Sequence, residues 1–407
     1  MTTWLDLPAD HPYGPHNLPY GVFSTADRAP RVGVRVGEWV LDAGAAAELG
    51  GMESGEVWLQ PSLNAFLAEG RDAWTAGRAW LVELLTNDAR RDCVEPHLLP
   101  VDQVRMHLPF DVADYVDFYA GEHHATNVGK IFRPDGEALT PNWKHLPIGY
   151  HGRSGTVVVS GTDIVRPQGQ RKAPSEPAPT FGPSTRLDIE AELGFVVGGA
   201  TALGEPVGVA GAADHIFGVT LLNDWSARDI QAWEYVPLGP FLGKSFATSV
   251  SPWVVTLDAL EAARVPLPGQ DDPGPLPYLC GDEGSVFGLD IHYEVVINGT
   301  VVARPEYRDM YWSPTQMLAH LTVNGASLRN GDLFASGTIS GPHKETRGSL
   351  LELTWNGTEP LTLDDGSTRG FLEDGDVVTL RAWAPGPGGS RIGLDEVTGT
   401  IQPARRG

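Results

Sequence analysis

The sequence predicts a mainly β, loop-rich globular protein. Its 407 residues are enough for two or three domains with a large buried core. Glycine contributes 49 residues and proline 33, which is above average but below the level typical of low-complexity chains. Between these turn-forming residues, short runs rich in β-branched side chains recur, as they do in proteins built from many short strands.

Charge and cysteine content narrow the classes of function. The formal net charge of -23 argues against nucleic acid and against an anionic membrane as partners. No apolar run is long enough to span a bilayer, and the N-terminus lacks the pattern of a signal peptide. Cys93 and Cys280 lie far apart, which argues against a disulfide framework and favours a reduced, cytoplasmic location. An anionic substrate would need a locally positive site.

Residues 1–110 are expected to form a separate small domain. Residues 31–42 alternate in hydrophobicity around a Gly-Glu pair, which predicts a β-hairpin. From 72 to 85 the apolar positions recur at helical spacing, with Asp72 as the expected N-cap. Residues 96–109 are predicted to be a connection, and nothing in this domain indicates catalysis.

The stretch 188–197 alternates acidic and apolar residues, which is the period of a strand with two unlike faces. Glu190 and Glu192 then project from one face, roughly 7 Å apart along the strand. Two such carboxylates repel each other, so either water solvates them or a cation lies between them. A second apolar run, 215–222, ends just before Asp224.

The residues that follow this second strand carry the opposite charge or donate hydrogen bonds. Arg228 and Gln231 lie in the turn after Asp224, and Lys244 lies shortly beyond. A strand that ends in an acid and is followed by these side chains indicates a site for a metal and an anion.

Residues 111–155 are dense in polar and aromatic groups, which is typical of functional loops. His123 and His124 are adjacent and follow the candidate acid Asp117 by a few residues. Either a catalytic or a structural role suits them on this pattern alone.

The C-terminal third contains a further candidate acid. Residues 349–355 are predicted to be a strand, with Glu352 as the acid on an otherwise apolar run. A buried carboxylate needs a partner, for which His124 is the candidate, although this strand face could also be solvated. A helix is expected over 311–328, a surface loop over 266–277 and a strand over 377–380.

Two long runs carry a resemblance to a known family. Residues 223–231 (Asn-Asp-Trp-Ser-Ala-Arg-Asp-Ile-Gln) and 233–246 resemble the fumarylacetoacetase (fumarylacetoacetate hydrolase) family, with matching segments through nearly all of 110–360. The paired glutamates alone mark only the wider superfamily, which includes decarboxylases, isomerases and hydratases of 2-oxo acids. The short N-terminal domain and the run 114–129 favour the hydrolases.

The resemblance implies an architecture and a metal site. It implies a small N-terminal SH3-like β-barrel, a C-terminal catalytic β-roll of mixed sheets over 111–407, and a homodimer. It also implies a divalent cation, Mg²⁺ or Ca²⁺, since all-carboxylate ligands suit these hard ions. The implied ligands are Asp117, Glu190, Glu192 and Asp224, with Lys244 and Thr248 lining a nearby ion site.

The resemblance also implies catalytic and substrate-binding residues. His124 is the expected general base and Glu352 the residue that orients it. Because residues 120–123 depart from the family pattern, the choice of His124 over His123 rests on register alone. Arg228, Gln231 and Lys244 match groups that handle the oxyanion and the leaving carbanion. The expected substrate contacts are Tyr119, Arg133, Tyr150, Gln231, Tyr235 and Thr338.

The implied activity is hydrolysis of a carbon–carbon bond in fumarylacetoacetate, giving fumarate and acetoacetate, the last step of tyrosine and phenylalanine breakdown. Its substrate is a small dicarboxylate diketone. One alternative is a related 2-oxo acid decarboxylase, isomerase or acylpyruvate hydrolase on the same scaffold. Another is a calcium-binding module without turnover, which would explain the carboxylates but not the convergence of Arg228, Gln231, Lys244 and His124.

Overall fold

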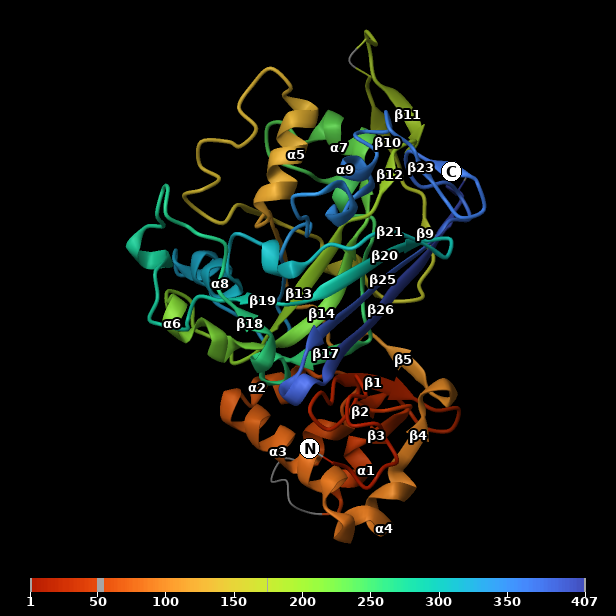
Figure 1. Cartoon of the computed structure of the whole chain (residues 1–407), viewed down its shortest axis with the longest axis vertical. Coiled ribbons are helices and arrows are strands. Elements are labelled where there is room, and N and C mark those ends of the chain that lie inside the picture. Colours follow the sequence, from red (N-terminus) through yellow and green to blue (C-terminus); the bar gives the residue numbers. More distant parts are fainter. Residues whose placement is uncertain (1, 50–54, 174, 406–407) are drawn as a thin grey trace.

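The computed structural model describes residues 2–49, 55–173 and 175–405 and is mainly β, with mixed sheets. Figure 1 shows the N-terminal residues, in red and orange, at one end of the long axis. The remaining residues form the larger part of the molecule above them. None of the helices in the described ranges is both long enough and apolar enough to cross a membrane.

The N-terminal part combines a small antiparallel sheet with helices. The predicted hairpin over 31–42 is confirmed, since Val36 pairs with Trp39. The predicted helix is also present, but it begins after Gly70, so Asp72 lies in its first turn and not at the N-cap. The elements are β1 (Tyr20–Ser24), β2 (Arg31–Val36), β3 (Trp39–Asp42), α1 (Ala43–Ala47), α2 (Asn64–Ala68), α3 (Arg71–Thr86), α4 (Arg91–Val94), β4 (Leu98–Pro100) and β5 (Arg105–His107).

The N-terminal sheet is open and continues into the rest of the molecule. Strand β1 pairs with β2, β5 and β17 (Trp253–Thr256), and no pairing among the described residues joins β4 to β5. The strands therefore do not close into a barrel. The segment 96–109 is more than a connection, because it contains both β4 and β5.

The largest sheet carries the acidic residues that the sequence singled out. Its order is β4-β3-β2-β1-β17-β14-β13-β22-β6-β7, with β16 paired to β14 and β8 paired to β16. Strand β14 is buried along its whole length, which explains its nearly continuous apolar sequence. The remaining strands are β6 (Tyr115–Phe118), β7 (Gly149–His151), β8 (Val157–Val159), β13 (Ala191–Val197), β14 (Ile216–Asp224), β16 (Thr248–Val250) and β22 (Leu333–Ala335).

A second sheet, of order β21-β20-β25-β26-β9, shares one apolar core with the first. The predicted strand at 377–380 is confirmed and extends to residue 385. The helix expected over 311–328 is shorter in the structure. A capping box formed by Ser313 and Gln316 sets its start, so residues 311–313 lie outside it. These elements are β9 (Ile164–Val165), β20 (His292–Ile297), β21 (Thr300–Ala303), α8 (Pro314–Thr322), β25 (Val377–Pro385) and β26 (Arg391–Gln402).

Short elements surround the two sheets. Residues 266–277 run over the surface almost wholly outside helices and strands, as expected. The pairs of short strands are β10 (Gln168–Arg171) with β11 (Thr180–Pro183), β12 (Leu187–Asp188) with β15 (Ser226–Ala227), β18 (Arg264–Val265) with β19 (Gly288–Leu289), and β23 (Leu361–Thr362) with β24 (Thr368–Arg369). Helix α6 (Val209–Ala212) lies near α8.

Two segments differ from the sequence expectation. Residues 349–355 do not form a strand, because the Ser349 hydroxyl accepts from the Glu352 backbone N–H and caps the short helix α9 (Leu350–Leu353). The segment with the adjacent histidines is not an extended loop but helix α5 (Glu122–Phe132), and helix α7 (Arg228–Glu234) follows β15. In Figure 1 these three helices lie at the end of the molecule away from the N-terminal part.

Gly337 lies where the backbone packs closely beside the acidic residues. It follows β22, which pairs with the strand that carries Asp117. Its φ is +75°, and an added Cβ would lie 2.2 Å from the Phe118 carbonyl oxygen. Gly366 has a similar φ of +82° but open space around it. An alanine at either position should cost about 1–2 kcal/mol for the left-handed conformation. Gly337→Ala should cost measurably more in urea unfolding, and equal losses would contradict this account.

Candidate active site

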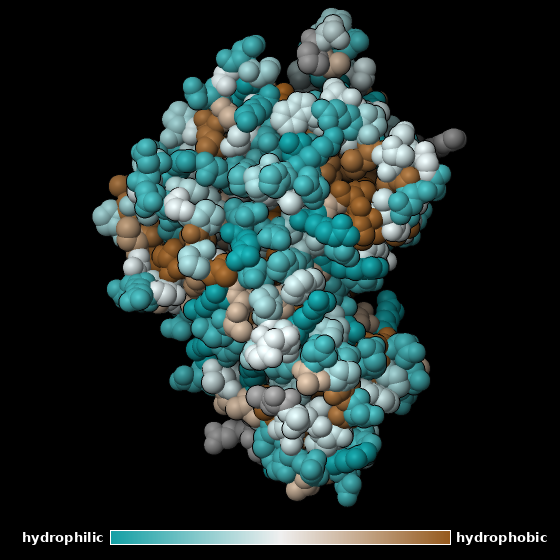
Figure 2. Space-filling view, viewed as in Figure 1, coloured by the Kyte–Doolittle hydropathy of each residue, from teal (hydrophilic) through white to brown (hydrophobic). Residues whose placement is uncertain are grey.

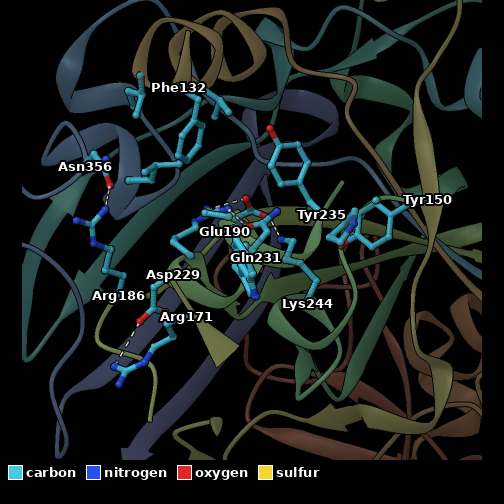
Figure 3. A pocket seen from close by; sticks show the side chains of 18 of the residues that line it. Phe132, Tyr150, Arg171, Arg186, Glu190, Asp229, Gln231, Tyr235, Lys244 and Asn356 are labelled. Carbon is cyan, nitrogen blue, oxygen red and sulfur yellow. Dashed lines mark hydrogen bonds and ion pairs between the residues drawn. The ribbon is translucent and has the colours of Figure 1, made fainter. Parts of the chain in front are cut away.

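A large cavity lies at the end of the molecule that carries α5, α7 and α9, with a volume of about 1220 Å³. Figure 3 shows Glu190, Gln231 and Lys244 near its centre, with Tyr150 and Tyr235 on one side. Of the sequence-predicted site residues, Glu192, Asp224, Thr248 and Glu352 are not part of the lining. The lining includes the others: Asp117, Tyr119, His124, Arg133, Tyr150, Glu190, Arg228, Gln231, Tyr235, Lys244 and Thr338.

Four buried carboxylates converge beside this cavity. Strand β6 supplies Asp117, β13 supplies Glu192, β14 ends in Asp224, and Glu190 immediately precedes β13. One carboxylate oxygen from each can be chosen so that all four lie within 4.8 Å of one another. The expected face of the 188–197 segment is confirmed, since both glutamates point into this cluster. The solvated alternative is wrong, because the exposed fractions are 4% for Glu190 and 0% for Glu192.

The cluster has an excess of negative charge and unfilled acceptor positions. Asp117 Oδ1 and Glu192 Oε1 are buried without a hydrogen-bond partner among the described residues. Burial, followed by the charges of neighbouring carboxylates, raises the pKa of Asp117 and of Glu192 well above the usual range. Hard oxygen ligands with two free acceptors fit a Mg²⁺ or Ca²⁺ ion, which would offset this repulsion.

Lys244 brings one positive charge into the cluster. Its Nζ contacts carboxylate oxygens of Glu190 and Asp224 and donates to Ser226 Oγ at 2.8 Å. Burial alone would lower the pKa of Lys244, but Asp224 and Glu190 raise it above its usual value, so the side chain is charged. One ammonium group cannot offset the charge of four carboxylates, so the cluster could also hold a divalent ion.

Asp224 is also held by two neutral donors. The Tyr150 hydroxyl donates to Asp224 Oδ2 at 3.1 Å, and Thr248 Oγ1 donates to Asp224 Oδ1 at 3.2 Å. Thr248 thus contacts a cluster acid from behind, since it is not part of the cavity lining. Tyr150 reaches Asp224 from the cavity side, where its position also suits a substrate contact.

Arg228 is fixed by three side chains. Its guanidinium donates to Asp188 Oδ2 at 2.8 Å, to Glu190 Oε1 at 2.7 Å and to Gln231 Oε1 at 3.2 Å. Burial opposes ionisation of Glu190, but Arg228 and Lys244 outweigh it and lower the pKa of Glu190 below the usual range. The guanidinium and one cluster acid are therefore both charged at the cavity wall.

His124 and Glu352 form a buried pair at the same cavity. His124 Nδ1 lies 2.6 Å from Glu352 Oε2, and His124 Nε2 lies 3.8 Å from Glu190 Oε1. Among the residues that the structure describes, the neighbouring His123 has no such contact with a carboxylate of the cluster or with Glu352. Glu352 is fully buried, which removes the alternative of a solvated face.

Three further donors saturate Glu352. Asn127 Nδ2 donates at 2.9 Å, Ser349 Oγ at 2.7 Å and Ser340 Oγ at 3.0 Å. Burial would raise the pKa of Glu352, but the His124 ring and these hydrogen bonds lower it below the usual range. The carboxylate is therefore ionised and fixed in orientation.

The expected substrate contacts lie at different depths. Thr338 is buried, and its Oγ1 has no partner among the described residues, whereas Tyr119 packs edge-on against His124 with ring centroids 5.4 Å apart. Arg133 is exposed and donates Nη2 to the Ala138 carbonyl at 2.8 Å. Tyr235 is half exposed at the end of α7. These last two lie at the rim of the cavity.

Some site residues were missed from the sequence. Asp188 has the same alternation as Glu190 and Glu192, so the period-two pattern contained the signal for it. Asn127 lies one helical turn after His124, but the segment was expected to be extended, which hid this relation. Ser349 lies three residues before Glu352, so the Ser-x-x-Glu pattern of a helix N-terminus contained a local signal for it. Ser340 contacts Glu352 only through the tertiary fold, and nothing local in the sequence indicates it.

The fold and the site define a class of protein: a mixed-sheet β protein with a carboxylate-rich candidate metal centre beside a His–Glu pair. Solved structures share the fold. A fumarylacetoacetate hydrolase from the psychrophile Exiguobacterium antarcticum has a TM-score of 0.55 at 18% identity, covering 95% of this chain and 100% of that one. A maleylpyruvate hydrolase from a Sphingobium species has a TM-score of 0.52 at 16% identity, with 95% and 100% covered. These likenesses show the fold alone.

Sequence relatives define the family. The family model for "Fumarylacetoacetase N-terminal" matches residues 16–109, and the model for "Fumarylacetoacetate (FAA) hydrolase C-terminal" matches residues 114–401. The fumarylacetoacetase of Homo sapiens is 49% identical over 416 residues, and that of Arabidopsis thaliana 46% identical over 422, each with 99% of both chains covered. The chain therefore belongs to the fumarylacetoacetate hydrolase family.

Removal of divalent cations should lower the melting temperature, because the cluster acids would then repel each other. Added Mg²⁺ or Ca²⁺ at about 100 times its dissociation constant should restore about 2.7 kcal/mol of stability. Because the pKa of Asp117 and of Glu192 is raised, protons compete with the cation at higher pH than for ordinary carboxylates. The stabilisation should therefore shrink as pH falls. Calorimetry of chelated and reloaded protein measures this, and equal melting temperatures would contradict a metal site.

Proposed function

We propose that this protein is a hydrolase that cleaves the carbon–carbon bond of fumarylacetoacetate to give fumarate and acetoacetate. Relatives named fumarylacetoacetase cover nearly the whole chain. The observation that carries the proposal is the placement of His124, paired with Glu352, 3.8 Å from the acidic cluster at one cavity. A calcium-binding module would not need this pair, nor would a decarboxylase or isomerase need it to activate water.

His124 is the proposed general base. A neutral imidazole can accept a proton from water near neutral pH, and its Nδ1–H is directed to Glu352. This leaves Nε2 free toward the cavity, as the geometry of catalytic triads requires. As His124 takes the proton, the ionised Glu352 stabilises the imidazolium, and the water oxygen bonds to the substrate carbonyl next to the alkene.

The bond that breaks must leave its electron pair on a carbon atom stabilised as an enolate. Asp117, Glu190, Glu192 and Asp224 would hold the divalent cation, Mg²⁺ or Ca²⁺, with Lys244 and Thr248 beside it. When bound, the cation draws charge onto the diketone oxygens. Arg228, Gln231 and Lys244 supply fixed donors for the developing negative charge. The departing acetoacetate enolate then takes a proton from a nearby lysine or from water, and His124 returns its proton to that donor, which restores the neutral base.

The substrate's two carboxylates need cationic and hydroxyl partners. Tyr119, Tyr150 and Thr338 lie within the cavity, while Arg133 and Tyr235 lie at its rim. We assign all five to substrate binding, together with Gln231. Tyr150 and Lys244 would contact both the substrate and the acids of the cluster.

We also propose a domain division, an oligomeric state and a cellular location. A division between residues 110 and 111 is supported by the two separate family matches. A homodimer is supported by exposed apolar side chains near the cavity, with 66% of Val236, 96% of Leu238 and 68% of Phe241 exposed. The two free cysteines support a cytoplasmic location.

The function is tested by the loss of diketone absorbance when the cation-loaded protein meets fumarylacetoacetate and shorter acylpyruvates. We expect turnover of fumarylacetoacetate that chelation abolishes. His124→Ala should remove most of it, whereas His123→Ala, one position along α5 and about 100° around it, should retain most. No turnover by the wild-type protein would overturn the proposed function. The reverse result for the two histidines would overturn the choice of base.

Glu352→Gln tests the partner of the base. It removes the charge that stabilises the imidazolium, and an orienting carboxylate in a comparable triad contributes about 10⁴-fold in turnover. We expect a smaller loss here, because other fixed charges share the electrostatic role. Stabilisation by the cation should be retained. Glu359→Gln, which changes an exposed surface carboxylate, is the control and should turn over normally. Equal turnover in the two variants would exclude Glu352 from the mechanism.

A further inference from the structure

Asp188 is a buried carboxylate to which the proposed mechanism gives no role. Its exposed fraction is 0%, and it is not part of the cavity lining. It cannot touch substrate. It lies at the end of β12, whose pairing with β15 sets Asp188 opposite Ser226, two residues before Arg228.

One side of Asp188 holds Arg228. Asp188 Oδ2 accepts from Arg228 Nε at 2.8 Å, while the two terminal nitrogens of the guanidinium reach Glu190 and Gln231. A guanidinium is planar, so fixing Nε and one terminal nitrogen fixes the direction of every other N–H. The orientation of Arg228 at the cavity wall therefore depends on Asp188.

Two further contacts of Asp188 hold helix α9. Asp188 Oδ1 accepts from the Leu350 backbone N–H at 2.7 Å, and Oδ2 accepts from the Leu351 backbone N–H at 3.0 Å. These are N-terminal amides of the helix that carries Glu352, and such amides have no partner within their own helix. A single carboxylate thus contacts both the arginine and the helix of the His124 partner.

We propose that Asp188 is a positioning residue that aligns Arg228 with the His124–Glu352 pair. This inference rests on the proposed hydrolysis. Water attack and the stabilisation of charge occur on one substrate, so their donors must keep one fixed relative geometry. Asp188 provides it by linking the β12–β15 pair to α9, two segments more than 120 residues apart in the sequence.

The test is a double-mutant cycle in turnover. Asp188→Asn keeps the shape but replaces one acceptor and removes the charge, and a misplacement of about 1 Å can cost about 10²-fold. We expect kcat to fall by about that factor with KM changed by less than about 3-fold. In the Arg228→Gln background, Asp188→Asn should cause a clearly smaller loss than in the wild-type background, because one of the two groups that it aligns is already gone.

Asp42 supplies a matched control far from the cavity. It is also buried, accepts from Arg31 Nε at 2.7 Å and caps α1 by accepting from the Ala45 backbone N–H at 3.1 Å. Asp42→Asn should lower the melting temperature but leave kcat of the folded protein unchanged. If Asp188→Asn behaves in the same way, or if its loss is fully additive with Arg228→Gln, the proposal is overturned.

Arg228→Lys decides the case if Asp188→Asn does not fold. Lysine keeps the charge but cannot contact Asp188 and Glu190 in a fixed plane. We expect a loss of kcat close to that of Arg228→Gln, and activity within about 10-fold of wild type would overturn the proposal. Turnover by the wild-type protein and by Asp42→Asn is measured first. If neither of these two proteins turned over fumarylacetoacetate, the proposed function would be overturned and not the role of Asp188.

Discussion

The rest of the structure depends on the burial of four mutually repelling carboxylates. Taking such groups out of water is costly unless cations or donors compensate them. Lys244 lies among the carboxylates, Arg228 neutralises Glu190 from one side, and Tyr150 and Thr248 donate to Asp224. Two acceptors still remain without a partner. The cluster could therefore hold a further cation, which would occupy these two acceptors.

The large sheet is what makes this concentration of charge possible. Strand β6 comes from a part of the chain distant from the consecutive strands β13 and β14, yet the pairing β14-β13-β22-β6 sets their acids at one end of these strands. The core beneath is apolar and continuous, with Phe195 stacked on Phe334 at a centroid distance of 4.9 Å. A rigid packed sheet resists the movement by which repelling carboxylates would otherwise separate.

The sequence predicted those features that have a local signature. Alternation placed Glu190 and Glu192 on one face, and the apolar run before Asp224 located the end of β14. Prediction from the sequence failed where a tertiary contact decides the local structure. Residues 350–353 have no helical period, and they form a helix because Ser349 and Asp188 satisfy their amides. The open sheet differs from the expected barrel because β17, far along the chain, pairs with β1.

The charges that line the cavity explain how an acidic protein can bind an anionic substrate. The chain has a net charge of -23, so its distant field repels a dianion. Within the cavity wall, however, cationic side chains outnumber the acids. The cations are Arg133, Arg171, Lys172, Arg186, Arg228 and Lys244, and the acids are Asp117, Glu176, Glu190 and Asp229. Because salt screens distant charges within about 8 Å at physiological ionic strength, the local lining governs binding once the substrate has entered.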